Sequence, residues 1–161
     1  MKYGRKYFLD KLVEHEGLML EVYKDSLGID TIGIGRNLKD RGISKEELEY
    51  LDIPTIEHVY EFGITKEDAY YLAENDIKIV EEELTKVHPC VKNLDVVRQL
   101  ILMDMAFNMG VPRLCKFKKM WKAIHKNNFD DASIEMLDSR WAKQVGRRAG
   151  ILSAAMVKGE F

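Results

Sequence analysis

The sequence predicts an α+β protein that is mainly α-helical and consists of two lobes joined by one long helix. Three observations support this fold class. Residues 18–35 alternate and turn like a β-hairpin, residues 65–89 carry a long helical repeat of apolar residues, and residues 96–109 are apolar almost all round. With 161 residues and 46% hydrophobic content, the chain is long enough to bury a substantial core.

Residues 4–15 predict an amphipathic helix, because their apolar side chains recur at helical spacing: Tyr7, Phe8, Leu12 and Val13. Gly17 is a natural end for this helix, since glycine accepts the left-handed conformation of a C-cap. Glu16 would then lie at the helix C-terminus, where the macrodipole disfavours an ionised carboxylate. Two interpretations stay open from this position alone: a solvated surface glutamate, or a functional residue that breaks a local rule.

The next segment predicts a hairpin. Leu18, Leu20 and Val22 alternate with polar or flexible neighbours, residues 25–28 carry turn chemistry, and residues 31–35 form the returning strand. Asp25 near the turn and Thr31 on the second strand can then come close enough to hold a water molecule between them. An ordinary hairpin with an aspartate at its turn is the alternative. Two carboxylates brought together by a turn are, however, the minimum for cleaving a glycosidic bond.

Residues 65–89 predict a long helix that begins with a capping box and ends before Pro89. Thr65 and Asp68 have the capping spacing, and the repeat that follows consists of Ala69, Leu72, Ala73, Ile77, Val80, Leu84 and Val87. Residues 96–109 predict the buried central helix of a bundle, with Gly110 as its C-cap. Their methionines are interpreted as core filler.

Three blocks of the chain resemble the phage-type lysozymes (endolysins) of glycoside hydrolase family 24, in particular the T-even phage branch. The first is E-G-x(7)-D followed by T-I-G-I-G, which begins at Glu16; the others are LDVVRQLILMDMAFNMG at 94–110 and SRWAKQVGRRA at 139–149. The resemblance implies one lysozyme domain, 1–161, in two lobes. The N-terminal α+β lobe would be 14–64, the connecting helix 65–89, and the C-terminal helical lobe 90–161 together with 1–13.

The resemblance also implies an activity: hydrolysis of the β-1,4 bond between N-acetylmuramic acid and N-acetylglucosamine in peptidoglycan, with inversion at the anomeric carbon and lysis of the host cell. Glu16 matches the family's general acid, Asp25 its second carboxylate and Thr31 its water-orienting threonine. Phe107 matches a substrate-contacting phenylalanine, and Asn37 occupies another substrate position. Two further substrate positions are changed here, to Met120 and Glu135, so the fine glycan preference stays open.

Three supporting residues follow from the same resemblance. Arg148 matches an arginine that pairs with the acidic glutamate, so we expect it to orient Glu16. Arg36 stands where family members often carry histidine, and Asp76 matches the aspartate that pairs with that histidine. Because Asp76 interrupts the apolar face of the long helix and an unpaired buried charge is costly, we expect an Arg36–Asp76 ion pair. The alternative is an exposed Asp76.

Neither a metal nor a cofactor is expected. Cys90 and Cys115 are not in a C-x-x-C pair, and no His/Cys cluster has ligand spacing, so free thiols are the interpretation. No apolar run approaches the roughly 20 residues of a membrane span, and the basic N-terminus has no apolar signal-peptide core. We therefore expect a protein that stays in the host cytoplasm until lysis, without membrane insertion, and acts on the cell wall as a monomer.

The charges are strongly polarised along the chain. Residues 1–89 carry 12 Lys/Arg and 20 Asp/Glu, a net charge of −8, and residues 90–161 carry 13 and 7, a net of +6. A basic C-terminal half could attract bacterial cell wall or nucleic acid. Its densest basic stretch, residues 116–126, has apolar residues at helical spacing, which favours core packing with lysines outside over a nucleic-acid surface. The expected partner is peptidoglycan, not nucleic acid. A silent peptidoglycan-binding module and a chitin-type glycosidase remain as alternatives.

Overall fold

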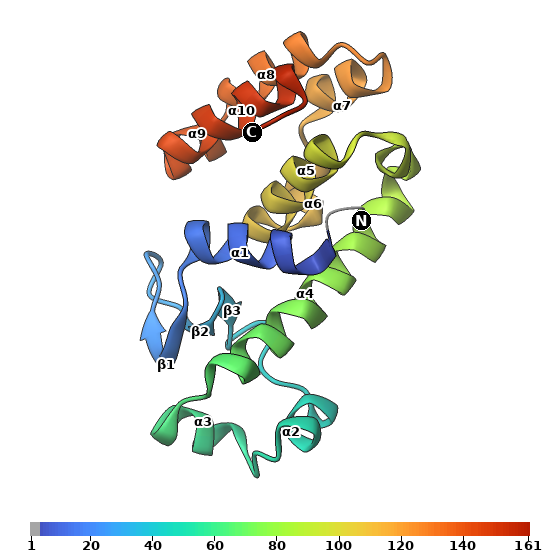
Figure 1. Cartoon of the computed structure of the whole chain (residues 1–161). Helices are drawn as coiled ribbons and strands as arrows, with labels where there is room; N and C mark the ends of the chain where they lie inside the picture. Colours follow the sequence, from blue (N-terminus) through green and yellow to red (C-terminus); the bar gives the residue numbers. More distant parts are fainter. Residues whose placement is uncertain (1–3) are drawn as a thin grey trace. The chain divides into compact units, whose positions relative to one another are not determined.

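The computed structural model describes residues 4–161, with side chains from Lys6 onward, and has the predicted mainly helical α+β class. The described chain divides into two compact units, residues 4–76 and 77–161, and the boundary falls inside helix α4 (Lys66–Val87). The first unit contains all the strands of the described chain, and the second contains only helices (Figure 1). The two units are described separately below.

A small antiparallel sheet and the helices around it make up the first unit. The chain runs through α1 (Gly4–Glu16), β1 (Met19–Lys24), β2 (Asp30–Gly33), β3 (Arg36–Asn37), α2 (Lys45–Leu51), α3 (Ile56–Phe62) and the first half of α4. The strand order is β1-β2-β3. Tyr23 on β1 faces Thr31 on β2, and Thr31 in turn faces Asn37 on β3. The central strand β2 therefore holds Thr31 between two neighbours.

Helix α1 ends where the sequence predicts. Glu16 is its last residue, and the N–H of Gly17 donates to the carbonyl of Val13 at 2.9 Å. Gly17 has a φ of +80°, the left-handed conformation that glycine adopts without a Cβ penalty. Phe8, Leu9 and Leu12 are buried on the inner face of the helix. The predicted helix and its glycine cap are confirmed.

Strand β1 follows the predicted alternation only in part. Leu18 and Val22 pack against the core, but Leu20 is 40% exposed. The reason is an irregularity in the ladder, because the pairing shifts between Met19–Gly33 and Tyr23–Thr31. The carbonyl of Leu20 instead accepts a hydrogen bond from the N–H of Ile64 at 2.9 Å, which ties β1 to the end of α3.

The core of the first unit lies between the sheet, α3 and α4. It is formed by Ile32, Leu38, Val59, Ile64, Ala69 and Leu72. The predicted capping box of α4 is present: the Asp68 N–H donates to Thr65 Oγ1 at 3.1 Å, and the Thr65 N–H donates to Asp68 Oδ2 at 3.0 Å. Of the apolar repeat predicted for α4, Ala69 and Leu72 belong to this core, and Ala73, Ile77 and Leu84 are also buried, whereas Val87 at the end of the repeat is 54% exposed.

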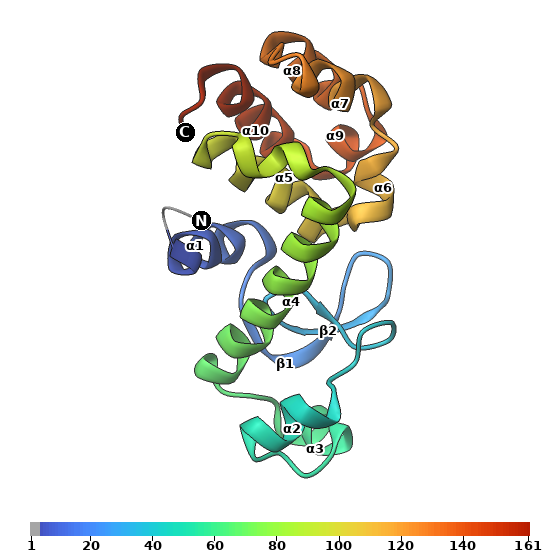
Figure 2. The same ribbon diagram turned by 90° about the vertical axis from the view of Figure 1, so that its right-hand side faces the viewer.

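The second unit is a helical bundle around α5 (Val96–Met109). The second half of α4 leads through η1 (Pro89–Asn93) into α5, and the chain continues as α6 (Val111–Cys115), α7 (Lys118–His125), α8 (Phe129–Leu137), α9 (Arg140–Val145) and α10 (Arg147–Lys158). Helix α10 packs against α8 and α5, and α7 packs against α8 (Figure 2). All residues from Leu100 to Ala106 are buried, and Gly110 caps α5 by donating to Ala106, both as predicted.

The basic stretch of the second unit packs as the helical spacing predicts. Met120, Trp121 and Ile124 of α7 are buried, whereas Lys118, Lys119 and Lys122 are exposed. Core packing with lysines outside is therefore confirmed for this helix. Cys90 and Cys115 are free thiols. None of the described helices combines the length and the apolar character that crossing a bilayer demands.

Candidate active site

The turn after β1 fixes one oxygen of the Asp25 carboxylate. Asp25 Oδ1 accepts hydrogen bonds from the backbone N–H groups of Leu27 at 2.8 Å and Ile29 at 2.9 Å. The Asp25 N–H donates to the carbonyl of Ile29, which closes the turn. Within the described residues, Oδ2 accepts no hydrogen bond. The carboxylate is thus held rigidly while one of its oxygens can serve another partner.

The Thr31 hydroxyl can accept a hydrogen bond, but its own hydrogen is already used in a hydrogen bond to the backbone. It is buried on β2, and its Oγ1 donates to the carbonyl of Ile29 at 2.9 Å. A hydroxyl has one donor and two acceptor lone pairs, so Thr31 can still accept a hydrogen bond from a water molecule. Asp25 and Thr31 are anchored to the same residue, Ile29, which fixes their relative placement.

Tyr23 lies beside the candidate residues of the first unit. It faces Thr31 across the β1–β2 ladder and lies two residues before Asp25, so the strand geometry turns Tyr23, Asp25 and Thr31 toward one face. Burial raises the pKa of the Tyr23 phenol, and the charges of Glu16 and Asp25 raise it further. Both carboxylates therefore lie near the same phenol. The sequence analysis missed Tyr23, although the two-residue period back from Asp25 would have indicated it.

The comparison with known families decides the relationship. The family described as phage lysozyme matches residues 13–155. The chain belongs to the phage lysozyme family. Lysozymes of this family are glycoside hydrolases that act on peptidoglycan, and the resemblance drawn from the three sequence blocks is confirmed.

Individual relatives agree with the family assignment. The chain is 31% identical to a probable T4-type lysozyme 2 of Dictyostelium discoideum over 87% of each protein. It is 30% identical to a probable T4-type lysozyme 1 of the same organism over 93% of each. It is also 29% identical to the pre-baseplate central spike protein Gp5 of Enterobacteria phage T4, over 94% of this chain but 28% of that protein.

In this phage lysozyme family member, Arg36 is the centre of a buried ion-pair network. Its side chain is 1% exposed, and its Nε donates to Asp76 Oδ2 at 2.9 Å, so the predicted Arg36–Asp76 pair is confirmed. Nη1 and Nη2 donate to the two carboxylate oxygens of Glu47 at 3.0 and 2.8 Å, and also to the carbonyls of Gly42 and Leu72. All five N–H groups of the guanidinium are therefore satisfied.

Glu47 is the network member that the sequence analysis missed. It also accepts from the side chain of Asn75 and from the backbone N–H of Ser44, each at 3.0 Å. Burial works to raise the pKa of Glu47, but the hydrogen bonds from Arg36, Asn75 and Ser44 outweigh it and lower the pKa to about 2. The spacing Ser44-x-x-Glu47 is a capping box at the start of α2, and it was the signal available in the sequence.

Arg148 contacts a carboxylate that the sequence analysis also overlooked. Its Nε donates to Asp104 Oδ1 at 2.9 Å, and its Nη2 contacts the same oxygen at 2.5 Å. Asp104 lies on α5 and is 2% exposed, so this helix, which is apolar almost all round, carries a buried charge at this position. The charge is tolerated because Arg148 pairs with it inside the same unit. Orientation of Glu16 by Arg148 stays a prediction, since these residues belong to different units.

The two predicted substrate residues lie on α5 and at the end of β3. Phe107 is half-buried on α5, between Ala106 and an exposed Asn108. Asn37 organises the turn after β3, because its Oδ1 accepts from the N–H groups of Lys39 and Asp40 at 2.9 Å each. Its Nδ2 also donates to the Asp40 side chain. Contacts of Phe107 and Asn37 with substrate stay predictions.

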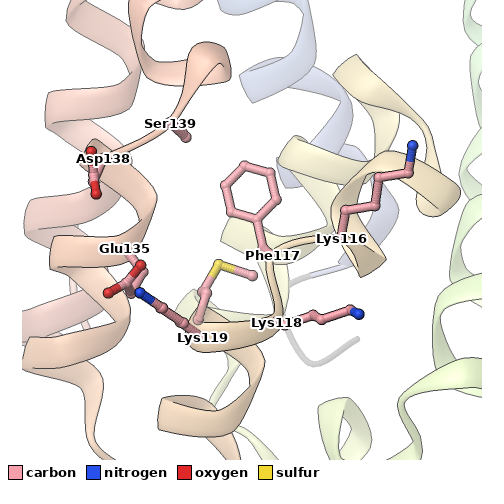
Figure 3. Close-up of a pocket in the computed structure, with 8 residues that line it drawn as sticks. Lys116, Phe117, Lys118, Lys119, Glu135, Asp138 and Ser139 are labelled. Carbon is pink, nitrogen blue, oxygen red and sulfur yellow. The ribbon is translucent and has the colours of Figure 1, made fainter.

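A cavity of about 410 Å³ opens in the second unit between α7 and α8. Figure 3 shows the Phe117 ring between Glu135 and Asp138 on one side and Lys116 and Lys118 on the other. The wall is completed by Lys119, Met120 and Ser139. Charges of both signs thus line one cavity, and the described residues form no ion pair across it. Met120 and Glu135, for which the family resemblance predicts changed substrate positions, both belong to this wall.

Among the described residues, no group of three or more His, Cys, Asp or Glu side chains is placed to hold a metal ion. The candidate site of the first unit offers two carboxylates, a hydroxyl and a phenol. These groups are suited to acid–base catalysis on a neutral sugar.

Proposed function

We propose that this protein is a muramidase that cleaves the β-1,4 bond between N-acetylmuramic acid and N-acetylglucosamine with inversion. The observation that carries the proposal is the Asp25–Thr31 arrangement. The turn fixes one carboxylate oxygen of Asp25 and leaves the other able to accept a hydrogen bond. The Thr31 hydroxyl already donates to the carbonyl of Ile29 and can still accept a hydrogen bond. Both groups can therefore accept the protons of one water molecule.

The proposed reaction assigns one step to each group. Glu16 donates a proton to the leaving glycosidic oxygen, while the water held by Asp25 and Thr31 attacks the anomeric carbon from the opposite face. Asp25 takes the proton that this water loses. Inversion calls for about 6.5–9.5 Å between the two carboxyl groups, enough for the water and the sugar to fit.

The decisive experiment replaces Glu16. Glu16→Gln keeps the shape of the side chain but removes the acid, so we expect kcat on purified peptidoglycan to fall by about two to four orders of magnitude. Glu14→Gln is the matched control, because Glu14 is exposed on the same helix. Near-parental lysis by Glu16→Gln would exclude the assignment.

Product analysis separates this proposal from its rivals. Mass spectrometry of the released fragments gives the reducing-end sugar, and proton NMR of the first products gives the anomer. N-acetylmuramic acid as the α-anomer supports the inverting muramidase. Release of chitin oligomers alone would favour a chitin-type glycosidase, and binding without a fall in turbidity would favour a silent module.

The cavity of the second unit supports a finer proposal about the peptide part of the substrate. Stem peptides carry carboxylates and, before cross-linking, a free amino group, so a wall with unpaired Lys119 and Glu135 suits them. We expect Glu135→Gln to slow hydrolysis of intact wall but not of glycan strands stripped of peptide. Asp130→Asn, exposed on the same helix, is the control. An equal effect on both substrates would contradict this role.

The biological setting follows from the same proposal. Hydrolysis of the wall glycan would lyse the host cell. The enzyme would act as a monomer on this insoluble polymer. Its proposed lobes are 14–64 and 90–161 (with 1–13), joined by helix 65–89. Size-exclusion chromatography with light scattering tests the oligomeric state. A mass of twice 18.7 kDa would contradict the monomer.

A further inference from the structure

The candidate site has a group that the proposed mechanism does not yet use. Tyr23 lies on β1, opposite Thr31 and two residues before Asp25, and is half-buried. Its hydroxyl has no hydrogen-bond partner among the described residues. Its phenol lies near both Glu16 and Asp25, the two carboxylates of the proposed reaction. A polar group placed in this way can interact with whatever occupies the site.

The other polar groups on this strand face act as acceptors. Asp25 Oδ2 is an acceptor when the carboxylate is ionised. Thr31 Oγ1 uses its hydrogen in the bond to the carbonyl of Ile29, so it can only accept a further hydrogen bond. Tyr23 supplies the complementary donor. Because burial and two carboxylates raise its pKa, the phenol keeps its proton through the neutral range and remains a donor there.

We propose that Tyr23 is a positioning residue whose hydroxyl donates a hydrogen bond to the attacking water. A water molecule has four tetrahedral hydrogen-bonding directions. In two of these directions the water donates its hydrogens to Asp25 and Thr31. In the third, one of its lone pairs accepts a hydrogen bond from Tyr23. The other lone pair then points at the anomeric carbon. This inference rests on the proposed muramidase mechanism and adds the group that fixes the direction of attack.

Tyr23→Phe removes the donor and keeps the ring. We expect kcat to fall roughly 10- to 100-fold with KM nearly unchanged, because a misplaced nucleophile affects the transition state and not substrate binding. A merely structural role would instead raise KM or lower the melting temperature together with kcat.

Tyr60→Phe is the matched control. The Tyr60 hydroxyl donates to Asp30 Oδ2 at 2.8 Å, and Asp30 lies next to Thr31 on the strand and so points to the other face. Tyr60→Phe therefore removes a hydrogen bond between a phenol and a carboxylate of the same sheet, but it changes no group of the candidate site. We expect Tyr60→Phe to keep the parental kcat and KM.

The outcomes distinguish this inference from the proposed function. Parental kcat in Tyr23→Phe, or a reduced kcat that comes with a raised KM or a lower melting temperature, overturns the positioning role, while an inactive Glu16→Gln leaves the muramidase assignment standing. An active Glu16→Gln removes the mechanism and this inference together. Circular dichroism melting curves of both tyrosine variants show that activities are compared between folded proteins.

Discussion

Arg36 and Glu47 form a bidentate ion pair in which the two side chains are 1% and 5% exposed. The pair joins strand β3 to helix α2, and Asp76 extends it to α4 through Arg36. Taking two charges out of water is costly, and the cost is offset here because every N–H of the guanidinium has an acceptor. The network therefore fixes the return of the chain after the hairpin that carries Asp25 and Thr31.

Removal of one partner should be strongly destabilising. Glu47→Gln leaves Arg36 buried with part of its charge uncompensated, so we expect a loss of about 3 kcal/mol in the free energy of unfolding. Urea denaturation measures it from the midpoint at constant m-value. Glu46→Gln is the control, because Glu46 precedes it on the same helix but is exposed. Equal midpoints for the two variants would contradict the network.

The same carboxylate predicts acid sensitivity. The pKa of Glu47 falls from its ordinary value of 4.5 to about 2 on folding. A lowered pKa contributes stability that is complete above the unfolded value and is lost as the pH falls from about 5 to 2, which amounts to about 3 kcal/mol. We expect unfolding curves at pH 7, 5 and 3 to show this loss in the parent and a flatter dependence in Glu47→Gln. Parallel curves would refute it.

His88 predicts a second pH dependence, in the other unit. Its ring stacks on Trp121 with centroids 3.6 Å apart, and its buried Nε2 has no hydrogen-bond partner among the described residues. Burial lowers the pKa of His88, and the nearby His125 lowers it further. The neutral form is therefore favoured in the folded protein. Its stabilisation is complete above the unfolded value near 6.5 and is lost as the pH falls through that value toward the folded pKa.

Tryptophan fluorescence during urea denaturation at pH 7.5 and 5.0 tests the histidine. We expect His88→Phe, which keeps the stack but does not titrate, to lose less stability than the parent over this interval. His58→Gln changes a histidine of the first unit, leaves His88 in place, and should keep the parental dependence. If His88→Phe and His58→Gln behave alike, His88 is not the group responsible.

Gly63 holds α3 against β1 at a distance that no other residue allows. Its φ is +73°, and a Cβ built there would lie 2.3 Å from the carbonyl oxygen of Leu20. We expect Gly63→Ala to destabilise the protein by about 2 kcal/mol or more, because the backbone itself must shift. Gly150→Ala is the opposite case: this helical glycine has open space at Cβ, so stability should rise by about 0.5–1 kcal/mol. Thermal melting of both variants measures the contrast.

Much of the fold and of the candidate site could be predicted from local sequence. The end of α1 at Glu16, the turn at Asp25, the capped start of α4 and the buried α5 all follow from side-chain chemistry within a few residues. Such features depend on neighbours along the chain, so the sequence contains their cause. The irregularity in β1 escaped prediction, because it depends on how Leu20 meets the end of α3.

By itself the sequence determined where the carboxylates, the threonine and the helix ends of this protein lie along the chain. Only the tertiary structure decided which residues come together: Glu47 beside Arg36, Asp104 beside Arg148, and Tyr23 beside the two carboxylates. Arg36 reaches Glu47 across 11 residues, and Arg148 reaches Asp104 across 44. A buried charge must find a partner, but the partner's identity depends on which distant segments the core brings together.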